Sequence, residues 1–109
     1  MSGDSAAREL ATIEQAQCVF RLYVAGSTPQ STRAIRNLKA LCEANLQGRY
    51  VLTVVDLYAQ PERAREDQIV VAPTLIRQTP LPVRRILGDL SNTNRVLATL
   101  DLTPAEPQP

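Results

Sequence analysis

The 109-residue chain contains no histidine and no tryptophan, and it has only two cysteines. Zinc sites, His-containing catalytic triads and imidazole acid–base catalysis commonly use histidine, so its absence argues against all three. Aromatic residues make up 4 % of the chain, so the core has to be built from Leu, Val, Ile and Ala. The 12 basic and 11 acidic residues give a net charge of +1, which provides no general attraction to nucleic acid.

Long apolar runs are also missing. No stretch approaches the ~20 apolar residues of a membrane-spanning helix. The N-terminal segment is polar and carries acids, unlike an apolar signal sequence. We therefore expect a cytoplasmic protein with no membrane partner and no bound cofactor or metal. In a reducing compartment, Cys18 and Cys42 are expected to be buried packing residues and not a disulfide.

Composition divides the chain into three segments. Residues 1–16 have few apolar residues and are expected to form a flexible N-terminal extension. Residues 103–109 contain three prolines and are expected to be a disordered tail. The folded domain is predicted to span residues 17–102.

The first half of the domain has the pattern of a strand, a helix and a second strand. Residues 18–25 favour a central buried strand, and residues 50–57 favour a second strand that is apolar on both faces. Between them, Thr28 and Pro29 are a typical helix start, and apolar residues then recur at helical spacing. Two buried strands joined by a helix predict a parallel pair.

The second half is predicted to contain a short charged helix over 62–69, strands over 74–77 and 83–87, and a final helix capped by Asp89 or Ser91. The link between the two strands is too short for a parallel crossover, so they should pair antiparallel. The resulting order, βαβαββα, predicts a thioredoxin-like α/β fold with a mixed four-stranded sheet. Pro73 stands just before the third strand, where thioredoxin-like proteins hold a cis proline.

The first turn of such a fold is where thiol chemistry is expected. Thioredoxin-like enzymes carry a Cys-x-x-Cys motif there, and the helix N-terminus stabilises its thiolate. Here the turn reads Gly26-Ser27-Thr28-Pro29. Neither cysteine is near this turn, and the sequence indicates no general base that would activate the hydroxyl groups of Ser27 and Thr28. The sequence therefore argues against a redox enzyme.

Three long segments resemble the KaiB family of circadian clock proteins: LYVAGSTPQSTRAIRNL over 22–38, YVLTVVDLYAQPERAREDQIVVAPTL over 50–75 and LPVRRILGDLSNTNRVLATLDL over 81–102. The resemblance implies a non-enzymatic regulator that binds the ring of the ATPase and kinase KaiC and modulates its phosphorylation cycle. It also implies capture of KaiA, competition with a sensor histidine kinase, and self-association to a dimer or tetramer.

Proteins of this family are metamorphic, which leaves a second fold to consider. The alternative is the family's ground-state order, βαββααβ, which shares the first half of the chain and differs in the second. Thr99 stands where a glycine is common in the family. Because threonine costs a helix less than glycine does, we expect Thr99 to favour the thioredoxin-like form, in which this segment is helical.

The resemblance further implies site residues. Arg33, Arg77 and Arg85 match basic positions that face KaiC, and basic side chains there would pair with acids of a partner ring. Arg84, next to Arg85 in the predicted strand, should face the other way. The positions expected to act in fold switching or in the architecture are Pro73, Gly88, Asp89, Thr99 and Asp101.

Two other functions are compatible with parts of the pattern. The same KaiC-like partner could serve stress adaptation or signalling without a true oscillator. A thiol-based or glutathione-using enzyme would instead need a reactive cysteine of low pKa, and the placement of Cys18 and Cys42 argues against one.

Overall fold

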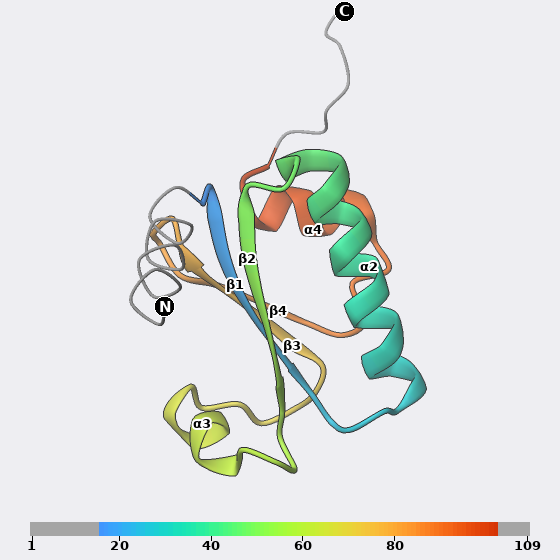
Figure 1. Ribbon diagram of the computed structural model, residues 1–109, viewed down its shortest axis with the longest axis vertical. Helices are drawn as coiled ribbons and strands as arrows, with labels where there is room; N and C mark the ends of the chain where they lie inside the picture. The colour runs from blue at the N-terminus through green and yellow to red at the C-terminus, as the bar shows by residue number, and fades with distance from the viewer. Residues whose placement is uncertain (1–15, 103–109) are drawn as a thin grey trace, which may run out of the picture.

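The computed structural model describes residues 16–102 (Figure 1). The expected N-terminal extension, apart from Ala16, and the expected tail lie outside the described residues. The elements follow the order βαβαββα, with these bounds and the labels of Figure 1: β1 Cys18–Val24, α2 Pro29–Leu46, β2 Tyr50–Asp56, α3 Pro61–Glu66, β3 Thr74–Thr79, β4 Arg84–Leu87 and α4 Thr93–Thr99.

One mixed sheet forms the centre of the described chain, with its strands in the order β2-β1-β3-β4. β1 pairs parallel with β2, and β3 pairs antiparallel with both β1 and β4. α2 and α4 cover one face of the sheet, and α3 lies on the other (Figure 1). The predicted thioredoxin-like arrangement is confirmed, and the alternative order βαββααβ is not the one observed.

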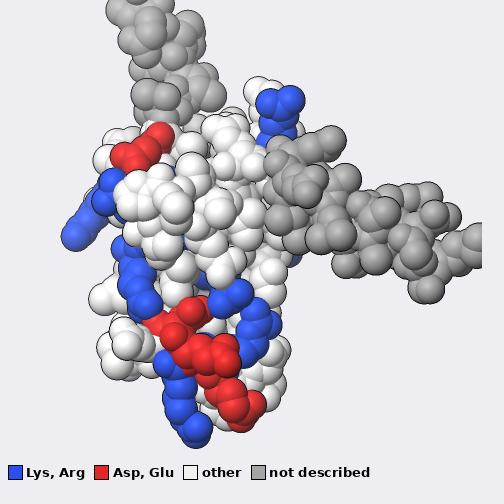
Figure 2. All heavy atoms as spheres, turned by 90° about the vertical axis from the view of Figure 1, so that its left-hand side faces the viewer, with Lys and Arg blue, Asp and Glu red and all other residues white. Residues whose placement is uncertain are grey.

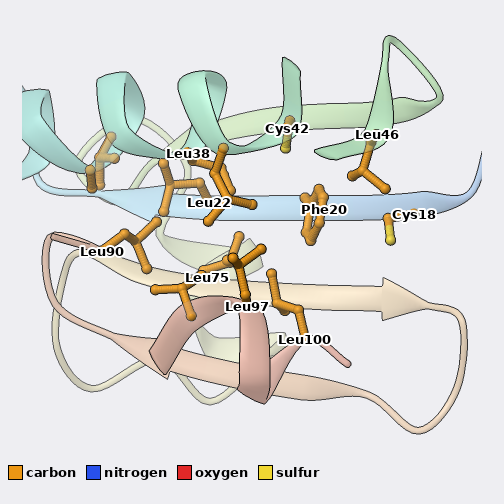
Figure 3. Close-up of a cluster of buried hydrophobic side chains, with 14 residues drawn as sticks. Cys18, Phe20, Leu22, Leu38, Cys42, Leu46, Leu75, Leu90, Leu97 and Leu100 are labelled. Atoms are coloured by element: carbon orange, nitrogen blue, oxygen red, sulfur yellow. The ribbon is translucent and has the colours of Figure 1, made fainter. Parts of the chain in front are cut away.

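The main core lies between β1, α2 and α4 (Figure 3). Side chains of a strand alternate between its two faces, so every second residue of β1 from Cys18 to Val24 points into this layer. Leu38 of α2 and Leu75 of β3 belong to this cluster and are fully buried. Apart from Phe20 and the two cysteines, the buried residues of this cluster are aliphatic, as the composition predicts.

Helix α2 begins where the sequence predicts it. Thr28 is the N-cap, and its hydroxyl oxygen accepts a hydrogen bond from the backbone N–H of Ser31 at 3.3 Å. A proline occupies the first turn, where no backbone N–H is needed. The helix ends at Leu46 because Gln47 and Gly48 have φ values of 51° and 80°, and this left-handed backbone cannot continue a helix.

Strand β2 does not have two buried faces, and that part of the prediction is wrong. β2 is an edge strand, and Val55 is its one buried residue. The neighbouring Val54 keeps an exposure of 40 %. An apolar run indicates a strand but not its place in the sheet, because exposure depends on which strands become its neighbours.

The opposite face of the sheet carries a smaller apolar cluster. Its buried residues lie on three different strands: Tyr23, Val55 and Ile76. α3 covers this cluster and is shorter than predicted, ending at Glu66 and not at residue 69. Gln68 has a φ of 55°, after which the backbone N–H of Ile69 turns back and donates to the Ala64 carbonyl oxygen at 2.9 Å.

Helix α4 is capped by Asn92, whose side-chain oxygen accepts a hydrogen bond from the backbone N–H of Arg95 at 3.1 Å. The prediction of Asp89 or Ser91 as the cap is therefore wrong. Asp89 instead forms a local turn, in which its carboxylate accepts a hydrogen bond from the backbone N–H of Ser91 at 3.1 Å. Three candidate capping residues within four positions left the sequence ambiguous at this point.

The bond before Pro73 is cis, in the position where the sequence places the cis proline of a thioredoxin-like fold. Pro73 is buried, and its carbonyl oxygen accepts a hydrogen bond from the backbone N–H of Gly88 at 2.9 Å. This contact joins the start of β3 to the end of β4. The bonds before Pro80 and Pro82, in the turn between these strands, are also cis.

Asp67 fixes the loop that follows α3 onto the sheet. Its Oδ2 accepts hydrogen bonds from the Tyr23 hydroxyl at 2.6 Å and from the Arg21 guanidinium at 2.7 Å. Partial burial raises the pKa of Asp67, but the hydrogen bonds from Tyr23 and Arg21 outweigh it, so the pKa lies below its usual value. The carboxylate therefore stays charged and ties the loop to β1.

Asp67→Asn should destabilise the domain by about 1–3 kcal/mol, since hydrogen bonds to charged groups are worth about 1.5–3 kcal/mol. A folded pKa below the unfolded value of about 3.9 means that this stabilisation is present near neutral pH and is lost as the pH falls through the folded pKa. Urea unfolding of both proteins from pH 7 to pH 2.5 should show the difference shrinking in acid. A difference that stays constant over this range would contradict the assignment.

Candidate functional site

The turn between β1 and α2 is the place where a thioredoxin-like enzyme would carry its thiols. Here it is a network of hydroxyl and carboxylate hydrogen bonds. The Thr28 hydroxyl donates to Ser31 Oγ at 2.9 Å, and Ser31 Oγ also accepts from the backbone N–H of Ala25 at 3.1 Å. Asp56, at the end of β2, accepts from the backbone N–H of Gly26 at 3.2 Å. The polar groups of the turn thus hold its shape.

Both cysteines lie in the main core, away from this turn. Cys18 is 1 % exposed and Cys42 is fully buried. Burial raises the pKa of both thiols, that of Cys42 to about 12. A thiol in this state is protonated at neutral pH and is a poor nucleophile, which argues against the thiol-enzyme alternative.

Arg33 lies on the exposed surface of α2 and reaches the segment after β4. Its Nε donates to Asp89 Oδ2 at 3.1 Å, while the Arg33 side chain stays 49 % exposed. Asn37, one turn further along α2, donates to the Asp89 carbonyl oxygen at 2.8 Å. Hydrogen bonds from Ser91 and Arg33 lower the pKa of Asp89. Gly88 precedes it with a φ of 102°, a backbone conformation that favours glycine.

Arg77 is buried, with an exposure of 1 %. Its Nη1 donates to the carbonyl oxygen of Leu100 at the end of α4, and its Nη2 donates to the Pro82 carbonyl oxygen at 2.9 Å. Asp101 Oδ2 lies 3.7 Å from Nη2. In this conformation Arg77 holds the end of α4 against the β3–β4 turn and does not face solvent. Its contact with a partner stays a prediction.

Thr99 and Asp101 lie at the same end of α4. Thr99 is the last residue of the helix, and its hydroxyl donates to the Arg95 carbonyl oxygen at 2.9 Å. Asp101 follows with a φ of 59°, and its Oδ2 lies 3.4 Å from Arg84 Nη2. The segment is helical as expected of the thioredoxin-like form, and the advantage of threonine over glycine stays a prediction.

Arg84 and Arg85 point to opposite sides of β4, as neighbours in a strand should. Arg84 reaches Asp101 beside α4, whereas Arg85 donates to the carbonyl oxygens of Asp67 and Gln68 on the α3 side. Figure 2 views the molecule from the α3 side and shows acidic side chains gathered in its lower half, with basic side chains beside them. Arg85 therefore does not share a surface with Arg77.

The structure separates the three predicted arginines but places two of them around one groove. The groove runs beside β4 and is lined by residues 85–92 and by Arg95, Val96 and Thr99 of α4. Arg85 is part of this lining, and so is Asp89, the partner of Arg33. We call this the β4 groove.

Arg95 is a basic residue of the β4 groove that sequence reasoning missed. The helical period of the sequence could have indicated that Arg95 is exposed, because Val96 and Leu97 are the buried residues of α4 and position 95 lies outside their apolar stripe. None of the ion pairs within residues 16–102 includes Arg95. What the sequence could not show is that this side of α4 borders the edge of the sheet.

Two further features, a metal-binding cluster and a membrane-spanning helix, are absent from residues 16–102. No group of three or more His, Cys, Asp or Glu residues in positions 16–102 lies close enough together to hold a metal ion. Over the same range, no helix is both long and apolar enough to cross a membrane.

A family model for the KaiB domain matches residues 21–102. The chain belongs to the KaiB family. The circadian clock oscillator protein KaiB of Synechococcus elongatus is 50 % identical to it over 90 residues, which cover 83 % of this chain and 88 % of the relative. The KaiB of Acaryochloris marina is 51 % identical over 84 residues, covering 77 % of this chain and 81 % of the relative.

Solved structures agree with the fold of this KaiB-family chain. The N-terminal domain of Synechococcus elongatus SasA matches with a TM-score of 0.62 at 23 % identity, covering 79 % of this chain and 85 % of that one. Mitochondrial thioredoxin 3 of Saccharomyces cerevisiae matches with a TM-score of 0.65 at 19 % identity, covering 90 % and 89 %. At these identities the likeness establishes the thioredoxin-like fold alone.

Both cysteines of the KaiB-family chain should be inert in the native state. Their burial and raised pKa values predict that a thiol reagent such as dithionitrobenzoate at pH 8 reacts with neither, and that both react once the chain is unfolded in guanidinium. Rapid reaction of one thiol in the native protein would contradict this prediction and revive the thiol-enzyme alternative.

Arg77→Met should loosen the end of α4. The change leaves two carbonyl oxygens without their donor, at a cost of about 1–3 kcal/mol each, so we expect the unfolding free energy to fall by roughly 2–6 kcal/mol. Urea unfolding gives the total, and amide exchange should rise first in residues 97–102. Arg84→Met is the matched control, with a side chain 42 % exposed and an expected loss of about 1 kcal/mol or less. Equal stability of the two variants would contradict the role of Arg77.

Proposed function

We propose that this protein is a non-enzymatic clock regulator in the cytoplasm that binds the ring of a KaiC-like ATPase and modulates its phosphorylation cycle. Membership of the KaiB family and curated relatives that are circadian clock proteins support the regulatory role. The buried cysteines and the hydrogen-bonded first turn support a binding function over a catalytic one.

The observation that carries the proposal is the basic β4 groove. Arg95 lines it on the α4 side, Arg85 belongs to its β4 edge with the guanidinium on the α3 side, and Arg33 lies at its border through the ion pair with Asp89. Basic side chains around an apolar groove favour an acidic partner surface, and they increase the rate of encounter more than they increase affinity. Arg77 is buried in this conformation, so contact through its guanidinium requires movement of α4.

Further partners follow from the family resemblance. Capture of KaiA, competition with a sensor histidine kinase and self-association to a dimer or tetramer are part of this proposal. The alternative setting, stress adaptation or signalling without an oscillator, keeps the same KaiC-like partner. The presence of a KaiA-like protein in the same cell would distinguish the two settings.

Arg95→Glu should weaken binding to KaiC of Synechococcus elongatus about tenfold, because a like charge then faces the acidic partner. Arg85→Glu should act in the same direction. Affinity and association rate are measured by surface plasmon resonance at two salt concentrations, and the loss should appear mainly as slower association.

Arg49→Glu is the matched control, because Arg49 is exposed and lies next to β2, at the other edge of the sheet. It should bind as the unmodified chain does, and thermal melts should show all three variants folded. Equal weakening by Arg95→Glu and Arg49→Glu would mean that net charge alone matters, and would contradict the β4 groove as the site.

A further inference from the structure

We propose that the free edge of β4 binds an extended acidic segment of the partner, which pairs with it as a fifth strand of the sheet. This inference rests on the proposed function, because it specifies how the same groove holds a partner. Three observations support it: the hydrogen-bonding phase of β4, the chemistry of the β4 groove, and the distribution of charge between the two edges of the sheet.

The backbone of β4 has hydrogen-bonding groups that point away from β3. Along antiparallel strands, directly bonded residue pairs alternate with non-bonded pairs. The backbone N–H of Gly88 donates to the Pro73 carbonyl oxygen at 2.9 Å, and the register of β3 and β4 continues in step from that pair. Positions 86 and 84 therefore bond to β3, while the N–H and C=O groups of Arg85 and Leu87 point outward.

These outward groups are available to another chain. None of the loop and cap hydrogen bonds within residues 16–102 uses the backbone of Arg85 or Leu87. A row of free donors and acceptors at a sheet edge is what an added strand pairs with. At about 3.4 Å per residue, the four residues of β4 give an edge of about 14 Å, which suits a segment of about four residues.

The β4 groove beside this edge has both apolar and basic lining. Ile86 and Leu87 supply apolar surface, and Leu87 keeps an exposure of 63 % although it belongs to a strand. Arg95 supplies positive charge on the α4 side, Arg85 carries its charge on the α3 side of β4, and the one acidic residue of the lining is already in an ion pair. The groove therefore fits a segment that carries both apolar and acidic side chains.

The alternation of side chains along β4 predicts a sequence pattern for the added strand. A residue of the added strand lies on the same face as the β4 residue opposite to it, so the two side chains interact. Acidic residues are favoured opposite Arg84 and Arg85, and apolar residues opposite Ile86 and Leu87. An antiparallel segment therefore reads, from its amino end, two apolar residues followed by two acidic ones.

Charge distinguishes this occupant from a second copy of the chain. A second β4 strand contains no acidic residue to place opposite Arg84 or Arg85, so pairing of two copies lacks this charge complementarity. The other edge strand, β2, has Asp56 as its one charged residue, so it offers no attraction to an acidic segment. The acidic strand is therefore directed to β4.

The test is amide hydrogen exchange of the chain alone and bound to KaiC of Synechococcus elongatus, resolved to single residues by electron-transfer fragmentation mass spectrometry. The amides of Arg85 and Leu87 should exchange rapidly in the free chain and at least tenfold more slowly in the complex. The amide of Ile86 already bonds to β3 and should be slow in both.

Two outcomes overturn the inference without touching the proposed function. In the first, a complex forms but exchange at Arg85 and Leu87 is unchanged, so docking uses side chains alone. In the second, these amides are slow in the chain alone and become slower as its concentration rises, so a second copy occupies the edge. If no complex forms, the proposed function is overturned. A peptide titration then tests separately whether the β4 edge binds an acidic strand.

In that titration, an acetylated and amidated peptide of sequence TVVEET is added to the isotope-labelled chain and followed by NMR, with TVVKKT as its matched control. Saturating shifts at Arg85 and Leu87 with TVVEET only, weakened at least fivefold in Arg95→Glu but not in Arg49→Glu, support the inference. Equal shifts with both peptides, or none at these amides, overturn it.

Discussion

A positive charge buried in β3 constrains the whole second half of this protein. The Arg77 guanidinium is shielded from water and needs other acceptors, which it finds in the carbonyl oxygens of Leu100 and Pro82. One acceptor lies at the end of α4 and the other in the turn between β3 and β4. A single side chain thus links both segments to the sheet, in addition to the apolar packing of α4 in the main core.

The thioredoxin-like frame is kept in this KaiB-family chain, while its thiol chemistry is not. The first turn occupies the usual place at the ends of the parallel strands, but Thr28, Ser31 and Asp56 use their polar atoms to hold it together. The two cysteines are in the core, where burial keeps them protonated. The proposed binding function therefore depends on the surface, where the β4 groove combines an edge strand with Arg95, a basic residue outside the ion pairs of residues 16–102.

Local signals predicted much of the fold. Thr28 as the cap of α2 and the alternation within β1 follow from the residues themselves, because caps and strand faces depend on near neighbours in the chain. The cap of α4 was ambiguous because three candidate capping residues stand within four positions, and the exposure of β2 was misjudged because it depends on contacts between distant segments. For the candidate site, the sequence indicated Arg33 and Arg85, which border the β4 groove, and Arg77, which is buried away from it, but it did not indicate Arg95.

The sequence by itself determined the order of elements, the aliphatic character of the core and the absence of thiol chemistry at the first turn, since each of these depends on residue type and spacing along the chain. Only the tertiary structure decided which strands lie at the edges of the sheet and which arginines are exposed to solvent. Arg77 and Arg85 are both arginines on neighbouring strands, and nothing local separates them. One lies beneath α4 and the other on the opposite side of the sheet, because helix packing covers one face at that point and leaves the other open.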